Sequence, residues 1–405
     1  MFRKLFILIV TAFVDMVGLL MVLPLMPYYA RELGGGSLMV SVMVVSFTAA
    51  QLLSAPLWGK FSDRYGRRPA LLVGLGAAAV AYIVFAFAES LWLLLLSRVI
   101  QGAGGGTVGV IQAYVADATE PQNRAKALGW LSAATNLGVA LGPPLGSAAL
   151  LAGGRSGPGL MAAALCLVNM LFAWRYLSES RDMEDARNSE KKPGASREAL
   201  LSVIKHAGEP GPRLIWIYAI AMGAFSGTTA IIALFLADQF GIGETRVWIF
   251  FTYIGVISVV TRIGVLGWAV DRFGEAKLSR VGLVLLASGL LAVPFSPNYV
   301  FLALAVALLP LGTAFTFPCV TSLLTRVISA SERGLYMGVQ QTYGGISRVI
   351  IPLWAGFAYD QFGRGVPFVT SAILVLGTVF LGLGVDDGRR SGKVAPEIAT
   401  EGVAP

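Results

Sequence analysis

The chain consists of long apolar runs separated by short polar segments, and this pattern restricts the fold more than any other feature of the sequence. A helix needs about 20 apolar residues to cross the hydrocarbon core of a bilayer. Twelve runs of about this length are expected as spans, at residues 5–29, 37–58, 70–88, 91–116, 126–153, 158–177, 214–237, 246–269, 278–295, 298–325, 334–358 and 366–385. The sequence therefore predicts an all-α membrane protein with twelve transmembrane helices.

The overall composition excludes a water-soluble protein. Apolar residues make up 56% of the chain and charged residues 13%, whereas soluble proteins average about 45–50% and about 25%. The first run continues for about 25 residues without a small-residue cleavage site, so it is predicted to be a retained span rather than a signal peptide. The chain is thus expected to be an integral membrane protein, and the lipid bilayer is its first partner.

Basic residues in the loops predict the orientation. Of the 31 lysines and arginines, 24 fall in loops on the side of the N-terminus and four in loops on the other side; the remaining three are Arg98, Arg262 and Arg348, inside spans. Loops rich in Lys and Arg stay in the cytoplasm. We therefore expect a multi-pass protein of the cell (inner) membrane with both termini cytoplasmic. The expected domains are a six-helix bundle at 1–177, a cytoplasmic linker at 178–213, a second bundle at 214–386 and a cytoplasmic tail at 387–405.

The two halves of the sequence repeat each other. Gly59, Asp63, Arg64 and Gly66 recur 208 residues later as Gly267, Asp271, Arg272 and Gly274. The segment Arg124 to Gly129 recurs as Arg333 to Gly338, and Pro143 recurs as Pro352, both at an offset of 209. Repeated bundles of this kind place a substrate site near the membrane midplane between them. Two pseudo-symmetric six-helix bundles are therefore predicted.

The loop between the second and third spans is a candidate cytoplasmic gate. It contains Gly59, Asp63, Arg64, Gly66, Arg67 and Arg68. The glycines allow close backbone approach, and the Asp63 carboxylate can face the positive N-terminus of a helix. Such a contact would hold the bundles together on the cytoplasmic side and break when the carrier changes state. The alternative, a basic loop that only sets topology, explains the arginines but not Asp63 or the glycine spacing.

In the fifth span, Gly138, Gly142 and Gly146 recur every four residues and share one helical face. Small residues on one face allow close helix packing, and Pro143 removes a backbone hydrogen bond and bends the helix. A smooth, bent interface suits a carrier whose bundles rock against each other. Plain packing, without any role in transport, is the alternative.

A lone acid in the first span is the candidate for proton coupling. Asp15 lies about eleven residues into its span, near the midplane, and Arg98 in the fourth span lies at a similar depth. Intramembrane carboxylates are costly and usually functional, so Asp15 is predicted to carry a proton and to pair with Arg98 during the cycle. Permanent neutralisation by Arg98 is the alternative.

Three further polar residues are candidates for the substrate cavity: Gln51, Gln101 and Arg348. Gln51 equally fits a hydrogen bond to a neighbouring helix. Arg348 lies mid-span and either lines the cavity, where it would meet an anionic substrate, or pairs with a carboxylate or backbone carbonyls. Arg262 lies closer to the inner face and is expected to extend towards it.

Catalytic and metal sites are not expected. Cys166 and Cys319 each lie inside an apolar run and His206 has no ligand partners nearby, so no metal or cofactor is predicted. The segment Gly104 to Gly109 matches a dinucleotide-binding fingerprint, but it lies in an apolar span with no strand before it, which favours helix packing. The basic residues are spread over loops rather than gathered in a patch, so no nucleic-acid partner is expected.

These motifs resemble those of the major facilitator superfamily. The loop from Gly59 to Arg68 is similar to its signature loop, the segment from Gly138 to Gly146 to the motif of its drug:proton antiporters, and Arg98 with Gln101 to a third motif of that group. Asp15, Gly18, Pro24 and Pro27 resemble the first span of tetracycline pumps. The acid that those pumps carry before a tyrosine in span three is replaced here by Ala81, before Tyr82. Those pumps carry another acid in span nine, and this chain has no acid in that span. The intramembrane Arg348 is not part of the pattern of those pumps.

The resemblance implies a secondary transporter and not an enzyme. It implies a proton-coupled exporter of small amphipathic molecules that works by alternating access, is driven by the proton gradient and acts as a monomer. A metabolite carrier for an organic anion or a sugar, with the same fold, is the first alternative. A membrane-embedded enzyme is the second, and it would need polar pairs that the spans do not offer.

Overall fold

The computed structural model describes residues 2–105, 107–119, 121–179, 195–329 and 332–384, and nearly all of these residues are helical. The N-terminal half consists of α1 (Phe2–Val22), α2 (Met26–Glu32), α3 (Ser37–Tyr65), α4 (Arg67–Ala86), α5 (Leu91–Gly104), α6 (Thr107–Ala118), α7 (Pro121–Gly153) and α8 (Gly157–Tyr176). The C-terminal half consists of α10 (Ala195–Lys205), α11 (Pro210–Phe240), α12 (Val247–Val260), α13 (Leu266–Phe273), α14 (Glu275–Ala292), α15 (Tyr299–Val327), α16 (Arg333–Phe362) and α17 (Val366–Leu381).

The twelve predicted spans are all present among the described residues. Nine helical stretches there are long and apolar enough to cross a membrane, and one of them, Ala127–Tyr176, contains both α7 and α8. The shorter α17 and the more polar α16 complete the set. α16 is less apolar because it carries Gln340, Gln341 and Arg348. The predicted fold class, an all-α membrane protein with twelve transmembrane helices in two bundles, is confirmed.

Three spans that were predicted as continuous are interrupted. The first breaks at residues 23–25, between α1 and α2, where Pro24 has no N–H group for the helix. The fourth breaks between Gly104 and Thr107, at a run of glycines that weakens helix continuity. The eighth contains a π-helical turn, Thr261–Val265, between α12 and α13. The predicted polar linker also differs, because α10 lies within it and α11 begins at Pro210 rather than at 214.

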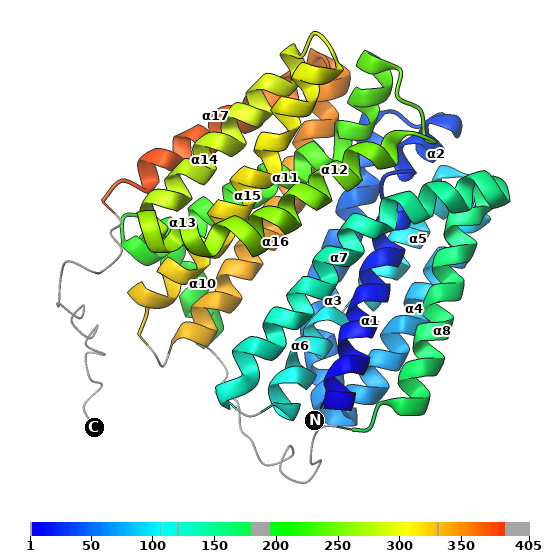
Figure 1. Ribbon diagram of the computed structural model, residues 1–405, viewed down its shortest axis with the longest axis horizontal. Coiled ribbons are helices and arrows are strands. Elements are labelled where there is room, and N and C mark those ends of the chain that lie inside the picture. The colour runs from blue at the N-terminus through cyan, green and yellow to red at the C-terminus, as the bar shows by residue number, and fades with distance from the viewer. Residues whose placement is uncertain (1, 106, 120, 180–194, 330–331, 385–405) are drawn as a thin grey trace.

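The helices form two groups that meet at one end and diverge at the other (Figure 1). α1 to α8 make up one group and α10 to α17 the other, and the N-terminus lies at the divergent end. The convergent end is the predicted outer side. The halves contact each other along α3 with α16 and along α7 with α12.

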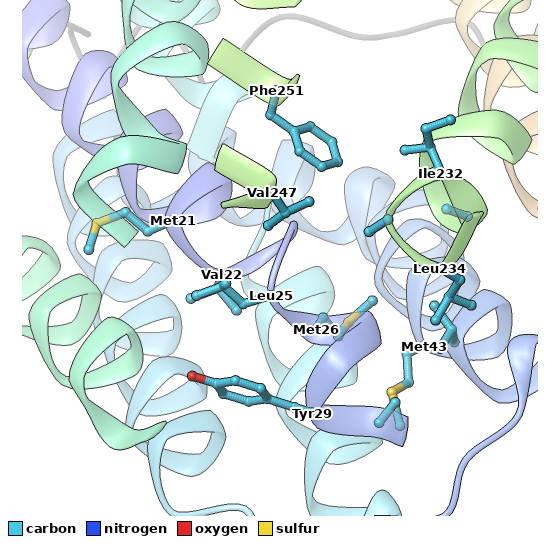
Figure 2. Close-up of a cluster of buried hydrophobic side chains, with 14 of the residues drawn as sticks. Met21, Val22, Leu25, Met26, Tyr29, Met43, Ile232, Leu234, Val247 and Phe251 are labelled. Carbon is cyan, nitrogen blue, oxygen red and sulfur yellow. The ribbon is translucent and has the colours of Figure 1, made fainter. Parts of the chain in front are cut away.

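A buried hydrophobic cluster spans both halves at the convergent end (Figure 2). Val22, Leu25 and Met26 of the first span belong to this cluster, together with Leu234 of α11 and Val247 of α12. Burial of apolar side chains between the halves excludes water from that side. In this conformation the route between the bundles is therefore closed towards the predicted outer side.

Candidate transport site

A cavity of about 420 Å³ lies between the two halves, with walls from α3, α6 and α16. Gln51 and Trp58 of α3 and Gly105 and Gly109 of the fourth span line it from the N-terminal half. Arg348 of α16 lines it from the C-terminal half. A concave site built from both bundles and mixing apolar and polar walls suits a small amphipathic ligand. The structure places Gln51 and Arg348 of the sequence-predicted set on this cavity.

Asp15 lies behind the cavity wall, at the break in the fourth span. The Thr107 hydroxyl, at the first residue of α6, donates a hydrogen bond of 3.1 Å to the Asp15 Oδ2. On the cavity side of the same break, the Gln51 Nε2 donates to the carbonyl oxygen of Gly105 at 3.1 Å. The carboxylate also faces the N-terminal turn of α6, which carries partial positive charge. The residues at this break therefore contact both Asp15 and Gln51, the second of which lies on the cavity wall.

Arg98 does not pair with Asp15 in this conformation. Its side chain is 1% exposed, its Nε donates to the Ser97 hydroxyl at 3.3 Å, and its guanidinium lies 5.3 Å from the centre of the Phe85 ring. Within the described residues, its two terminal nitrogens have no hydrogen-bond partner. The predicted pairing belongs to another state of the protein or does not occur.

Gln101 does not lie on the cavity. It is buried, and its Nε2 donates to the Tyr82 hydroxyl at 2.6 Å. That hydroxyl in turn lies against α1, because a Cβ atom at Gly18 would be 3.2 Å from it. Gln101 therefore joins α5 to α4 and α1 inside the N-terminal bundle. The expectation that it contacts substrate stays a prediction, and in this conformation Gln101 does not line the cavity.

The predicted loop from Gly59 to Arg68 is helical except for Gly66, which separates α3 from α4. Ion pairs within the N-terminal half hold this segment. Arg67 pairs with Asp63 at 3.1 Å and with Asp117 at 2.9 Å. The carboxylate that faces the N-terminus of α4 is that of Glu179, which accepts from the backbone amides of Arg67 and Arg68 at 2.9 and 3.0 Å. The role of Asp63 in holding the two bundles together on the cytoplasmic side stays a prediction. Glu179 was missed because it follows the last span of the half, far from the loop in sequence.

The other residues of this segment make local contacts. Gly66 has a φ of 102°, which favours glycine, and its amide closes the end of α3 on the Ser62 carbonyl. Gly59 lines the cavity. Arg64 is exposed and stacks on the Tyr65 ring at 5.4 Å, while Arg68 donates to the Trp174 carbonyl at 2.5 Å.

The C-terminal half repeats this turn with its charges exchanged. Gly274 has a φ of 78° and separates α13 from α14, as Gly66 separates α3 from α4. The next residue is Glu275, which pairs with Arg326 at 2.8 Å, whereas the N-terminal half pairs Arg67 with Asp117. Gly267, Asp271 and Arg272 are exposed. The repeat found in the sequence is thus a structural repeat. The residue after the glycine is basic in the N-terminal half and acidic in the C-terminal half, and its partner has the opposite charge in each case.

The glycine face of α7 packs directly on α1. A Cβ atom at Gly138 would lie 2.9 Å from the Phe13 carbonyl oxygen, and one at Gly142 would lie 2.6 Å from the Leu20 Cβ. A Cβ atom at Gly146 would lie closer to the Met21 carbonyl oxygen than van der Waals contact allows. Pro143 lies inside α7. These glycines bring the backbone of α7 against the helix that carries Asp15.

The glycines from 102 to 105 serve packing as well. A Cβ atom at Gly104 would lie 2.6 Å from the Ala77 Cβ of α4. One at Gly102 would lie closer to the Phe47 carbonyl oxygen of α3 than van der Waals contact allows. The expectation that this segment packs helices rather than binding a nucleotide agrees with these contacts. No group of three potential metal ligands occurs within the described part of the chain.

Asp238 at the end of α11 connects the two halves on the predicted outer side. Arg31 of the N-terminal half donates to both of its carboxylate oxygens, at 2.6 and 2.7 Å. Tyr359 donates to one of these oxygens at 2.7 Å, and Arg364 donates to the Asp238 carbonyl at 2.8 Å. Asp360 adds a second contact between the halves, because it accepts from the backbone amides of Ser37 and Leu38. No sequence pattern indicated these contacts, because the residues that make them lie far apart in the chain.

A further carboxylate lies close to this group. Burial and the neighbouring Glu32 raise the pKa of Glu244, and the nearby Arg155 partly offsets this effect. Arg155 also pairs with Glu32 at 3.5 Å. Charge on the predicted outer side is thus concentrated where the two halves meet.

We expect Asp238→Asn to weaken closure of the outer side. The substitution keeps the size of the side chain but removes the charge that holds Arg31, and partly exposed bidentate pairs of this kind contribute about 1 kcal/mol. The population with separated outer ends should therefore rise several-fold. Spin labels at Glu89→Cys and Pro297→Cys, on exposed loops of the two halves, would report it as longer inter-label distances, since the native cysteines are buried. The control is Asp271→Asn, and an unchanged distance distribution in Asp238→Asn would contradict the role given to this residue.

The comparisons with known proteins agree with this architecture. The family model of the Major Facilitator Superfamily matches residues 8–266 and 263–403. The class B tetracycline resistance protein of Escherichia coli is 26% identical over 92% of this chain and 92% of its own length. Multidrug resistance protein 1 of Bacillus subtilis is 27% identical over 87% of this chain and 89% of its own length.

Among solved structures, the human organic anion transporter MFSD10 superposes with a TM-score of 0.66 at 23% identity, covering 94% of this chain and 99% of its own. This likeness concerns the fold alone. Twelve spans, two repeated bundles and a cavity between them define a carrier. The chain belongs to the major facilitator superfamily, and it is a transporter and not an enzyme.

Proposed function

We propose that this protein exports small amphipathic molecules in exchange for protons, by alternating access. The observation that carries the proposal is the position of Asp15. It lies inside a transmembrane helix, makes no ion pair among the described residues, and accepts a hydrogen bond from Thr107 at the break beside the cavity. An acid in such a place can gain and lose a proton within reach of a substrate site.

The break in the fourth span supplies a physical link between proton and substrate. A protonated Asp15 loses its negative charge, so its attraction for the Thr107 hydroxyl and for the N-terminus of α6 weakens. The opposite end of the break is held by Gln51 on the cavity wall. A ligand that moves Gln51 therefore moves the group that binds Asp15. Coupling of this kind is reciprocal, so proton release and substrate binding influence each other equally.

The conformation described is one of the two that alternating access requires. Asp238 and the hydrophobic cluster close the outer side, while the bundles diverge at the end that carries the N-terminus (Figure 1). The ion pairs of Arg67 stay within one half. We assign this state as open to the cytoplasm, with both termini on that side of the cell membrane and a single chain as the functional unit.

One observation favours a second candidate, a metabolite carrier for organic anions. Arg348 offers a positive charge on the cavity wall, which a neutral or cationic drug does not require. The similar fold of a human organic anion transporter is compatible with this alternative. Exporter and metabolite carrier differ in the direction of proton movement if the metabolite carrier is a symporter.

The test measures proton movement in proteoliposomes that contain a pH-sensitive dye. Tetracycline, added outside, is the first probe, and vesicles without protein are the control. An antiporter releases lumenal protons as the probe enters, so the lumen should become more alkaline. Acidification would identify a symporter, and the absence of any protein-dependent change across a panel of amphipathic probes would reject proton coupling.

A further inference from the structure

The C-terminal half places two arginines inside the membrane that have no negative partner among the described residues. Arg262 lies in the π-helical turn and Arg348 in the middle of α16. Neither takes part in an ion pair within the described residues. The acidic residues described between 214 and 384 all lie at helix ends or in loops: Asp238, Glu244, Asp271, Glu275, Glu332 and Asp360.

Arg348 faces the cavity with most of its hydrogen-bonding capacity unused. It lines the cavity, and its one described hydrogen bond is a long one, 3.4 Å from Nε to the Gly344 carbonyl oxygen. A guanidinium has five N–H donors in a planar fork that fits a carboxylate or phosphate with two parallel bonds. The side chain is therefore free to bind an anion in the cavity.

Tyr218 and Gln341 surround the same place. Gln341 lines the cavity and its Nε2 donates to the Tyr218 hydroxyl at 3.3 Å. The Tyr218 ring lies against α16, because a Cβ atom at Gly344 would be 2.8 Å from it. Polar side chains of α11 and α16 thus gather near Arg348 beside the cavity.

Arg262 is a second positive charge inside the C-terminal half, although it does not line the cavity. Its Nε is buried and has no hydrogen-bond partner within the described residues. It lies in a π-helical turn, a distortion that is frequent at functional sites. An unpaired cation inside a membrane protein is costly, so a ligand that brings negative charge into the cavity is stabilised by Arg348.

We propose that the transported substrate is an amphipathic anion whose carboxylate, or a group of the same charge, binds Arg348 beside Gln341. Leu52, Ala55 and Trp58 of α3 line the cavity from the facing half and receive its apolar body. The proposal rests on the proposed transport function and narrows its substrate class. Exchange of such an anion for a proton moves charge across the membrane, so transport is electrogenic.

The test compares three probes of the same shape and different charge: 2-naphthoate, 2-naphthamide and 2-naphthylmethylammonium. Their affinities for the purified protein in detergent are measured by titration calorimetry. The wild-type protein should bind naphthoate more tightly than both analogues. Arg348→Gln should weaken naphthoate binding about tenfold or more and leave naphthamide binding unchanged, and Arg348→Lys should restore part of the difference.

Arg280→Gln is the matched control. Arg280 also donates from Nε to the carbonyl four residues earlier, at 3.1 Å from Ala276, but it does not line the cavity. Its substitution should leave all three affinities unchanged. Equal weakening of naphthoate and naphthamide in Arg348→Gln would mean a structural role only, and a wild-type protein without preference for naphthoate would overturn the proposal. Because this measurement involves no proton gradient, it can succeed even if antiport is disproved in proteoliposomes.

Discussion

Asp15→Asn is expected to abolish proton-driven transport, to at most about one hundredth of the wild-type rate. The asparagine keeps the size of the side chain and can still accept from the Thr107 hydroxyl, which lies 3.1 Å from Oδ2 in the wild type. It cannot bind and release a proton. Substrate binding should therefore survive, because neither Asp15 nor Thr107 lines the cavity. Asp15→Glu keeps the ionisable group and should retain partial activity with a shifted pH optimum.

The decisive measurement is proton release from the purified protein when substrate binds, compared between wild type and Asp15→Asn. Thr107→Val serves as the control, because it removes the hydrogen bond but leaves the carboxyl group. It should still release protons, with an altered dependence on pH. If Asp15→Asn releases as many protons as the wild type, the coupling group lies elsewhere, and Asp117 at the end of α6 is the next residue to examine.

Gly142→Val is expected to prevent folding or transport almost completely. A Cβ atom at this position would lie 2.6 Å from the Leu20 Cβ and 2.9 Å from the Val17 carbonyl oxygen. Overpacking of this kind costs about 1–3 kcal/mol even where side chains can yield, and here the obstacle includes backbone. α7 would be pushed away from α1, the helix that contains Asp15.

Gly129→Val on the same helix provides the comparison, because nothing lies within 4 Å of a Cβ atom at Gly129. Thermal stability in detergent and transport in proteoliposomes should both fall for Gly142→Val and stay near wild type for Gly129→Val. A stable, fully active Gly142→Val protein would show that the two helices have room to separate, and the packing role of the glycine face would be rejected.

Much of the architecture was predictable from local sequence. The runs of apolar residues predicted the spans, and the recurrence of Gly59 to Gly66 as Gly267 to Gly274 predicted the two related bundles. The glycine spacing in the fifth span predicted a close contact on one face of a helix, although not that the partner would be α1. The breaks near Pro24 and Gly105 were missed because hydropathy continues across them, while the backbone does not.

The candidate site was predicted only in part. Gln51 and Arg348 reach the cavity, whereas Gln101, which follows Arg98 by three residues, turns into the bundle and donates to Tyr82. Their sequence context is similar, because all are polar residues in apolar helices. Which of them faces the cavity depends on the rotation of each helix about its axis, and neighbouring helices set that rotation.

The sequence by itself determined that the chain crosses the membrane, how often, and in two related halves. These properties follow from the transfer free energy of each segment into lipid, which is a sum over that segment's own residues. The tertiary structure alone decided that Arg31 meets Asp238, 207 positions later, and that Glu179 rather than Asp63 faces the N-terminus of α4. Lipid tails are as apolar as the helix surfaces, so hydrophobicity does not distinguish a lipid-facing side from a helix-facing one. Close packing and a few polar contacts make that choice, and they exist only once the helices are assembled.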